Sequence, residues 1–265
     1  MRILTWNLWW RYGPWQRRRA AIAATLAEAG PDICGLQEVW QAGEENLGGA
    51  LAAELGLHWC WAEAGRHRDR DGHEVLIGNA ILSRWPITAQ AELRLNTGDI
   101  AGGRVALHAR IAAPAGALPM FTTHLSYQPG ASRVRTEQVR QLAGFMATHG
   151  TDGDYPPVVT GDLNAEPGSD ELRLLGGLLT PPAAPGLVLV DAWRYADPAD
   201  PGFTWDRRNG YQANTLLPDS RIDYILAGLP RQGRGRVESA RLAGNTPVDG
   251  VWPSDHFAVT AELKS

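Results

Sequence analysis

The segment Val158-Val159-Thr160-Gly161-Asp162-Leu163-Asn164 places two polar side chains directly after a short apolar run. Its β-branched residues predict a strand over residues 158–163. Because side chains alternate along an extended chain, Asp162 and Asn164 are expected to point to the same side. An acid and an amide placed in this way can hold a water molecule and a phosphate oxygen together. Taken alone, the segment is equally consistent with an ordinary turn, since Asp and Asn are common turn residues.

Six further polar clusters close or follow apolar stretches in the same way. They are Thr5-Trp6-Asn7, Leu36-Gln37-Glu38, Gly78-Asn79-Ala80 with Ser83-Arg84, Thr123-His124-Leu125-Ser126, Arg221-Ile222-Asp223-Tyr224 and Ser254-Asp255-His256. Each cluster alone is a weak signal. As an ordered set they indicate one cleft, because strands that end in such groups can gather them together. Oxygen ligands, amides and imidazoles of this kind suit a divalent metal ion and a phosphate ester.

Glu38 follows the apolar run Ile33-Cys34-Gly35-Leu36. A carboxylate in such a position is costly unless it is paired or bound to a metal ion, which makes Glu38 a candidate metal ligand. A strand-end glutamate that faces water is the simpler interpretation of this residue alone. The chain has no cysteine pair and no helical His-Glu-x-x-His motif, so a zinc site is not expected. Oxygen-rich ligands favour Mg²⁺, with Mn²⁺ as a substitute.

Asp223 lies inside the short apolar strand predicted over residues 221–227 and needs a partner, for which His256 is a good candidate. A buried carboxylate would orient the imidazole and favour its charged form. The alternative is a purely structural Asp–His pair. His124 follows another apolar strand, where a single histidine is more often structural than catalytic.

Aromatic residues crowd two loops. Trp9, Trp10, Tyr12 and Trp15 follow Asn7, and Phe203 and Trp205 lie in a second loop. Hydrophobic packing explains some of them, and others are candidates to line a cleft. The predicted substrate-binding residues are Asn79, Arg84, Tyr127, Trp10 and Trp205.

The composition is that of an ordinary globular protein, with 44% hydrophobic and 20% charged residues among 265. The net charge of −4 gives no support to non-specific binding of duplex DNA, which usually needs a basic face. Basic runs occur at residues 17–19, 66–70, 207–208 and 231–236. Solvated surface is the simpler interpretation of each run.

Cys34 and Cys60 lie inside apolar runs and are expected to be buried, free thiols, which favours a reduced compartment. We find no signal segment, and no run approaches the roughly 20 apolar residues that a membrane span needs. We therefore expect one domain over residues 1–265 that is cytoplasmic and monomeric and has no membrane span.

The predicted elements do not alternate strictly between strand and helix. Strands are predicted over residues 2–8, 32–39, 57–63, 75–82, 87–95, 104–111, 118–125, 158–163, 187–192, 221–227, 237–242 and 256–263, helices over 16–29, 44–55, 132–149 and 169–175, and a charged loop over 65–74. Such an order suits two packed sheets with helices outside. The helix over 132–149 is expected to turn Arg135 and Gln138 toward solvent.

The seven clusters together resemble the motifs of the endonuclease/exonuclease/phosphatase superfamily, which includes pancreatic deoxyribonuclease, abasic-site endonucleases, neutral sphingomyelinases and inositol polyphosphate 5-phosphatases. They match in order from residue 5 to residue 256, so the resemblance covers essentially the whole chain. It implies an α/β (α+β) fold, a four-layered sandwich in which helices flank two central, mainly antiparallel sheets. It also implies a Mg²⁺-dependent phosphoesterase that cleaves a phosphodiester or phosphomonoester by in-line attack of water.

The resemblance also implies roles for the matched residues. Glu38 would be the main metal ligand, with Asn7 near the metal and the phosphate, and Asp255 near the metal or supporting the catalytic histidine. Asn164 and His124 would hold non-bridging phosphate oxygens.

Proton transfer is assigned in the same way. Asp162 would orient or deprotonate the attacking water, and His256, paired with Asp223, would stabilise developing charge or transfer a proton. Asp162 and His256 both remain candidates for the general base.

The substrate stays open at this stage. The basic, DNA-penetrating loops of abasic-site enzymes and the longer basic signatures of inositol phosphatases have no clear counterpart in the chain. Nucleic acid, a lipid head group and a small phosphoester all remain candidates. The alternative function is a catalytically inactive binding module on the same fold.

Overall fold

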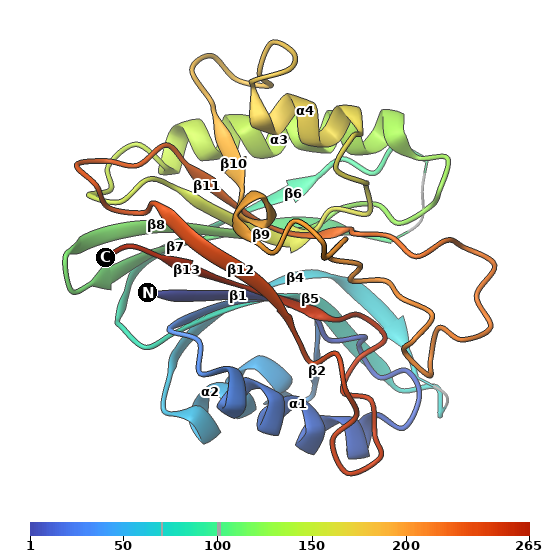
Figure 1. The fold of residues 1–265 in the computed structure, drawn as a ribbon. Helices are drawn as coiled ribbons and strands as arrows, with labels where there is room; N and C mark the ends of the chain where they lie inside the picture. Colours follow the sequence, from blue (N-terminus) through green and yellow to red (C-terminus); the bar gives the residue numbers. More distant parts are fainter. Residues whose placement is uncertain (70, 100–101) are drawn as a thin grey trace.

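Two β-sheets pack face to face, and helices cover the outer face of each sheet (Figure 1). This arrangement appears in a computed structural model that describes residues 1–69, 71–99 and 102–265. Four layers result, with α1 (Trp15–Ala29) and α2 (Leu47–Leu55) on one side and α3 (Ser132–His149) and α4 (Asp170–Gly176) on the other. The predicted four-layered sandwich is confirmed.

The first sheet contains seven strands within the described residues. They are β1 (Arg2–Asn7), β2 (Ile33–Ala42), β3 (Glu45–Asn46), β4 (His58–Arg68), β5 (Glu74–Ser83), β12 (Val237–Ala243) and β13 (Ala258–Leu263). Their order is β12-β13-β1-β2-β5-β4, and β3 pairs with β2 outside this path. β1 and β2 are parallel, whereas their other pairings are antiparallel.

The second sheet has six strands in the same described part of the chain. They are β6 (Ile87–Leu95), β7 (Arg104–Ala113), β8 (Gly116–His124), β9 (Val158–Asp162), β10 (Leu189–Asp191) and β11 (Asp223–Gly228), in the order β10-β11-β9-β8-β7-β6, and the 3₁₀ helix η1 (Ala192–Tyr195) follows β10. Here β8 and β9 form the parallel pair.

Three apolar layers hold the four structural layers together. Neighbouring residues of β1 face opposite ways, since Ile3 packs between the sheets and Leu4 packs toward the helices on the first sheet. Phe121 and Leu142 belong to the third layer, between the second sheet and its helices. Each such side chain contributes on the order of 2 kcal/mol through burial. Strands that are buried on both faces explain the nearly continuous apolar runs of the sequence.

Each sheet contains one strand–helix–strand unit with parallel strands, β1-α1-β2 and β8-α3-β9. The strands of a parallel pair end at the same edge, so their polar C-terminal residues meet there. Asn7 closes β1, and His124 and Asp162 close β8 and β9 as register partners. The two units therefore bring the predicted clusters to neighbouring sheet edges.

Two predicted boundaries are wrong for local reasons. The helix predicted from residue 44 begins at Leu47, because residues 45–46 pair with β2 and Asn46 accepts a hydrogen bond from the N–H of Gly49 at 3.2 Å. The predicted loop over 65–74 is partly strand, since β4 continues to Arg68 and pairs with β5.

The helix over residues 132–149 has the predicted bounds but not the predicted solvent face. Arg135 and Gln138 are buried, because both hold the loop that follows β8. Both cysteines are buried and free, as predicted.

Candidate active site

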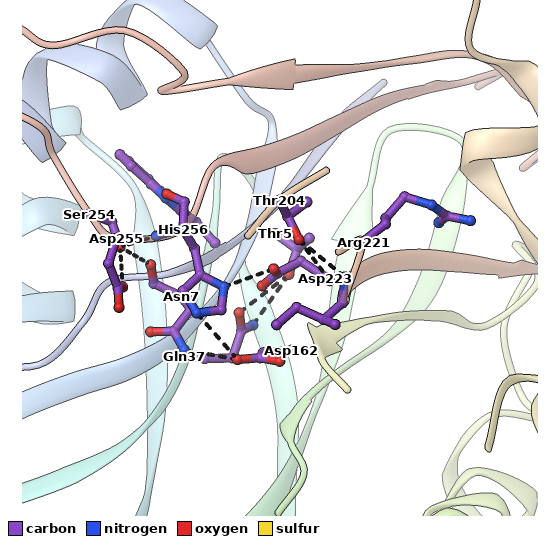
Figure 2. A network of polar contacts seen from close by, with 12 residues as sticks. Thr5, Asn7, Gln37, Asp162, Thr204, Arg221, Asp223, Ser254, Asp255 and His256 are labelled. Carbon is purple, nitrogen blue, oxygen red and sulfur yellow. Dashed lines mark hydrogen bonds and ion pairs between the residues drawn. The ribbon is translucent and has the colours of Figure 1, made fainter. Parts of the chain in front are cut away.

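Neighbouring strands of the second sheet align three candidate residues. His124, Asp162 and Asp223 are register partners across β8, β9 and β11. Asn7, from the first sheet, donates a hydrogen bond from Nδ2 to Asp162 Oδ2 at 3.0 Å. Figure 2 shows this contact within a network that also includes His256. The site therefore lies where the two sheets meet.

Glu38 lies within β2, at a position where the backbone is irregular. Its φ is +53°, and the register with β5 shifts between Leu36 and Val39. An irregularity of this kind re-aims a side chain next to a functional site. Glu38 Oε1 accepts a long hydrogen bond from Asn7 Nδ2 at 3.4 Å, and Oε2 is buried with no partner among the described residues. Burial, reinforced by the nearby Asp162, raises the pKa of Glu38 above its ordinary value.

His256 is held by Asp223. Its Nδ1 lies 2.9 Å from Asp223 Oδ2, and the Thr204 hydroxyl accepts a hydrogen bond from the Asp223 N–H at 3.3 Å (Figure 2). Burial favours neutral imidazole, but the carboxylates of Asp223 and Asp255 outweigh burial and raise the pKa of His256 well above 6.5. The surroundings of His256 therefore favour its charged form.

His124 has the opposite charge state. Its Nε2 lies 3.4 Å from Asp162 Oδ2, and its Nδ1 lies 4.0 Å from Glu38 Oε1. Burial and the guanidinium of Arg104 lower the pKa of His124 to about 3. The surroundings of the two imidazoles thus favour opposite charge states.

The chain turns sharply after β9. Asn164 has a φ of +48°, and its N–H donates to Asp162 Oδ1 at 3.0 Å. The expectation that Asp162 and Asn164 share one side of an extended strand is therefore wrong, and the alternative of an Asx-type turn describes the segment. Asn164 still lines the cavity, with Nδ2 donating to the carbonyl of Leu125 at 3.1 Å.

Asp255 is a buried carboxylate with two side-chain partners. Its Oδ2 accepts from Gln212 Nε2 at 3.0 Å, and its Oδ1 accepts from the Ser254 hydroxyl at 3.4 Å. Burial, with a further contribution from Glu38, raises the pKa of Asp255 to about 7. A cation near these crowded carboxylates would lower their cost of ionisation.

A cavity of about 860 Å³ opens over these groups and is lined by Asn7, Glu38, His124, Asp162, Asn164, Asp255 and His256. Of the predicted substrate-binding residues, Tyr127 and Trp205 line it. Trp205 packs edge-on against His256, with ring centroids 5.1 Å apart. A volume of this size is typical of a small-molecule site.

The other three predicted substrate-binding residues do not line this cavity. Trp10 is buried between the first sheet and its helices, with Nε1 donating to the carbonyl of Leu76 at 3.2 Å. Arg84 pairs with Asp32 at 2.9 Å, beside the start of β2 and thus at the opposite end of the strands. Asn79 is buried and donates to the carbonyl of Val105 at 2.8 Å. The contacts of Trp10 and Arg84 explain these two residues structurally. Asn79 also lines a small pocket together with Glu38 and His124, so it lies beside the catalytic groups and its substrate-binding role stays a prediction.

Sequence reasoning missed several residues of the cavity. Trp9 and Tyr12, which were general candidates to line a cleft but were not among the predicted substrate-binding residues, line it in place of Trp10. Arg104 lines it at the start of β7, with Nε donating to the carbonyl of Leu125 at 3.0 Å. No carboxylate of the described residues lies within 4.0 Å of the Arg104 guanidinium. A single arginine before a buried strand carries no sequence signal of its own.

No helix in the described part of the chain combines the length and apolar character that crossing a bilayer requires.

The sequence profile of the endonuclease/exonuclease/phosphatase family matches residues 4–256. No curated protein matches the chain. Similar solved structures include an endonuclease/exonuclease/phosphatase from Beutenbergia cavernae, at 22% identity and a TM-score of 0.75, covering 100% of this chain and 71% of that one.

Two further structures of similar fold belong to proteins with more specific names. One is the mannosyl-6-phosphatase Bt3783 of Bacteroides thetaiotaomicron, at 18% identity and a TM-score of 0.72, with 100% of both chains covered. The other is a truncated Caenorhabditis elegans TDP2, at 20% identity and a TM-score of 0.66, covering 100% of this chain and 97% of that one. At these identities the likeness concerns the fold.

Proposed function

Because the chain belongs to the endonuclease/exonuclease/phosphatase family, as its ordered motifs predicted, we propose that it is a metal-dependent hydrolase of phosphate esters. The observation that carries the proposal is the convergence of Glu38, Asp162 and His256 on one cavity. A structural neighbour named as a mannosyl-6-phosphatase is consistent with chemistry on a phosphate ester.

The donor atoms fit a divalent cation. Glu38 Oε2 is a buried oxygen without a partner in the described residues, and Asn7 and Asp255 line the same cavity. Glu38 would hold the ion, with Asn7 and Asp255 as further ligands, and these oxygen donors suit Mg²⁺ or Mn²⁺. The bound ion would supply positive charge against the charge that develops on the phosphate oxygens.

A second group of possible ligand atoms is a weaker candidate for the metal site than the group around Glu38. Asp162, Asp223 and His256 bring such atoms within 4.8 Å of one another. Asp223 Oδ2 already engages His256 Nδ1 at 2.9 Å, and carboxylate–imidazole pairs of this kind serve catalysis without metal. We therefore assign the cation to Glu38.

Asp162 is the proposed group that positions water. Its side chain is only 2% exposed, and hydrogen bonds from Asn7 Nδ2 and the Asn164 N–H fix its two oxygens. A fixed carboxylate can orient a water molecule for in-line attack and accept its proton. Its contribution is expected to be about 10²–10⁴-fold in rate.

His256 is the proposed cation of the site. Asp223 keeps the imidazole charged and fixes its orientation through Nδ1, which leaves Nε2 directed toward Asp162 at 3.9 Å. An imidazolium at this point can donate to a phosphate oxygen whose charge grows in the transition state. Removal of one such donor costs roughly 10²–10³ in kcat.

Three further hydrogen-bond donors complete the proposed phosphate site. His124, with its lowered pKa, can hold a phosphate oxygen through N–H without adding charge. Arg104 brings a guanidinium that the described carboxylates leave unpaired, and guanidinium groups recognise phosphate well. Asn164 borders the same space and would contact a further oxygen.

A direct test uses bis-p-nitrophenyl phosphate and p-nitrophenyl phosphate with Mg²⁺, with Mn²⁺ and with a chelator. We expect hydrolysis of at least one ester that depends on the metal. Glu38→Gln, Asp162→Asn and His256→Gln should each lower kcat at least 100-fold while the variant remains folded by circular dichroism.

Matched controls are Glu137→Gln and His58→Gln, because both side chains are exposed on the surface. Near-wild-type turnover in all three site variants would overturn the proposal. So would the absence of any metal-dependent hydrolysis by the folded wild-type protein.

A further inference from the structure

The wall of the catalytic cavity differs between its two sides. The side built by the first sheet and its loops is largely aromatic and apolar and includes Trp9, Tyr12, His67 and Ile77. The side built by the second sheet, α3 and α4 carries most of the polar side chains, which are Tyr127, Ser132, Arg135, Glu166, Ser169 and Glu171, beside the apolar Pro129 and Ala165. The catalytic groups lie where the two sides meet.

We propose that the polar side is a subsite for an uncharged polyhydroxyl group, such as a sugar or polyol, that is esterified to the substrate phosphate. The inference rests on the proposed phosphoesterase function and narrows its substrate. The residues that support this subsite take no part in the proposed hydrolysis.

A buried ion pair forms the floor of this side. Arg135 Nε lies 2.9 Å from Glu171 Oε1, and the two side chains are 7% and 1% exposed. Arg135 Nη1 also donates to the carbonyls of Ser126 and Gln128, at 3.1 and 2.9 Å. A buried ion pair of this kind is often replaceable by apolar residues without loss of stability. The pair holds the loop that follows β8, and it also places a guanidinium and a carboxylate in the cavity wall.

The charge balance of the polar side disfavours a second anionic group. The charges of Arg135 and Glu171 cancel within the pair, and Glu166 adds a carboxylate to the same wall. Arg104, at the start of β7, offsets the charge of Glu166, but it is already proposed to bind the substrate phosphate. A second phosphate of a nucleic-acid strand would therefore find no further cation without a carboxylate partner among the described lining residues of this side, and it would face the Glu166 carboxylate. An uncharged substituent carries no such penalty.

The polar side of the cavity offers both hydrogen-bond donors and hydrogen-bond acceptors. Carboxylates accept, the guanidinium donates, and the hydroxyls of Ser132 and Ser169 do both. Ser169 Oγ accepts from the Leu172 N–H at 3.4 Å as the cap of α4, a contact that uses only its acceptor capacity. Hydroxyl groups on a ligand also donate and accept, so several of them on adjacent carbons match this wall.

Tyr127 adds a flat surface beside these polar groups. Its side chain is 61% exposed, and the Arg104 guanidinium carbon lies 5.9 Å from its ring centroid. The apolar face of a sugar ring can pack on such an aromatic side chain while its hydroxyls reach the polar wall. The arrangement places the substituent next to the phosphate that Arg104 is proposed to bind.

The test compares esters that differ only in hydroxyl groups. Glucitol 6-phosphate and hexyl phosphate share a six-carbon chain, and the p-nitrophenyl diester of each extends the comparison to diesters. A dinucleotide with a 5′-phosphate represents a nucleic-acid strand. With Mg²⁺ or Mn²⁺ present, we expect kcat/KM for the polyol ester to exceed that for the hexyl ester by roughly 100-fold or more, because a site built around hydroxyls rejects analogues that lack them.

Two variants connect this ratio to the polar wall. Glu166→Gln, at an exposed position, should lower the polyol-to-hexyl ratio roughly tenfold, through loss of one charge-assisted hydrogen bond. Glu171→Gln should lower it further, but it leaves Arg135 without its carboxylate and can unfold the protein, so Glu166→Gln remains the deciding variant. Glu137→Gln, on the exposed face of α3, should leave the ratio unchanged.

The outcomes separate the inference from the proposed function. Hydrolysis with a ratio near one, faster hydrolysis of the dinucleotide, or an unchanged ratio in Glu166→Gln would overturn the subsite and leave the phosphoesterase standing. If no ester is hydrolysed, the proposed function fails. Calorimetry with glucitol 6-phosphate and hexyl phosphate then decides the subsite, and equal affinity for the two would overturn it.

Discussion

Arg18 Nη1 lies 3.0 Å from the carbonyl oxygen of Pro253, a residue 235 positions further along the chain. The same nitrogen donates to the carbonyl of Leu8 at 2.8 Å, and the rest of the guanidinium donates to the carbonyls of Trp9, Trp10 and Tyr12. Arg18 is 1% exposed. It therefore joins the aromatic loop of the cavity wall to the segment that leads into Asp255 and His256.

This relationship predicts that Arg18→Met destabilises the protein by about 3–5 kcal/mol, because five main-chain carbonyls lose a charged donor. Arg18→Lys keeps the charge and should recover part of both stability and kcat. Denaturant unfolding gives the free energies, and kinetics at a temperature where both variants are folded gives kcat. Arg19→Met is the control, since Arg19 is 42% exposed and, among the described residues, forms an ion pair with Glu45 alone, and it should cost less than about 1 kcal/mol. Equal losses at the two positions would contradict the assigned role.

Asp223→Asn should lower kcat by roughly 10³–10⁴-fold with a small change in KM, because the amide can hold His256 in the wrong tautomer and no longer favours imidazolium. The comparison is Asp206→Asn, another buried aspartate, which pairs with Arg208 rather than with an imidazole. Steady-state kinetics of both variants on the best p-nitrophenyl ester makes the measurement. Similar kinetic losses in both would show that the effect is general destabilisation.

If Glu38 holds the metal ion, Mg²⁺ binding should raise the free energy of unfolding through this residue. Without a cation, Glu38→Gln should not destabilise the protein, because it replaces a mostly buried carboxylate whose pKa is already raised. With Mg²⁺ at 100 times its dissociation constant, the wild-type protein should gain about 2.7 kcal/mol, and Glu38→Gln should lose most of this gain. Thermal melting across a Mg²⁺ titration, with Ca²⁺ and Na⁺ as comparison ions, measures both effects. An equal gain in the variant would show that the ion binds at a site other than Glu38.

The aromatic loop predicts opposite results for neighbouring residues. Trp10→Ala should cost about 3–5 kcal/mol of stability, since the side chain is 5% exposed and packed. Tyr12→Ala should change stability little, since Tyr12 is 47% exposed, but should raise KM because Tyr12 lines the cavity. Unfolding free energies and KM values for the same pair of variants check this. A raised KM in folded Trp10→Ala with none in Tyr12→Ala would reverse the assignment.

The same loop shows what sequence could and could not predict. Order and chemistry of the motifs were enough for the sheets, the four layers and the gathering of Asp162, Asp223 and His256, because strand ends at one sheet edge must meet. Which aromatic faces the cavity depends on local backbone angles, such as the φ values of +56° at Trp9 and +34° at Trp10. Such angles follow from tertiary contacts, including those of Arg18, and cannot be predicted from the amino-acid composition.

The pairing of the strands and other tertiary contacts explain why some residues lie elsewhere than the sequence predicted. Asn79 and Arg84 belong to one motif, yet β5 carries Arg84 past the start of β2, to the edge away from the site. Glu38 was expected at a strand end, whereas it lies within β2 at an irregular position that only the pairing with β5 defines. Arg18 lies in a basic run typical of solvated surface, and its burial comes from carbonyls of the nearby loop after β1 and of the distant Pro253.

His108 predicts a pH dependence of stability that is independent of the active site. The residue is 5% exposed, and both ring nitrogens are buried without a partner among the described residues. Burial, with the charges of His149 and Arg110, lowers its pKa from 6.5 to about 4. The unfolded chain therefore takes up a proton at His108 before the folded protein does. Stability from this group is complete above pH 6.5 and falls as the pH drops from 6.5 toward 4, by at most on the order of 3 kcal/mol.

His108→Phe removes the titrating group and places a phenyl ring beside Phe121 and Phe145. We expect its stability relative to the wild type to improve steadily as the pH falls from 7 to 4.5, measured by denaturant unfolding at each pH. His149 stacks on His108 with ring centroids 5.1 Å apart, so His149→Phe tests whether it shares the effect. His58→Gln, at an exposed position, should track the wild type throughout. A difference between His108→Phe and wild type that stays constant across this pH range would show that His108 carries no linked proton.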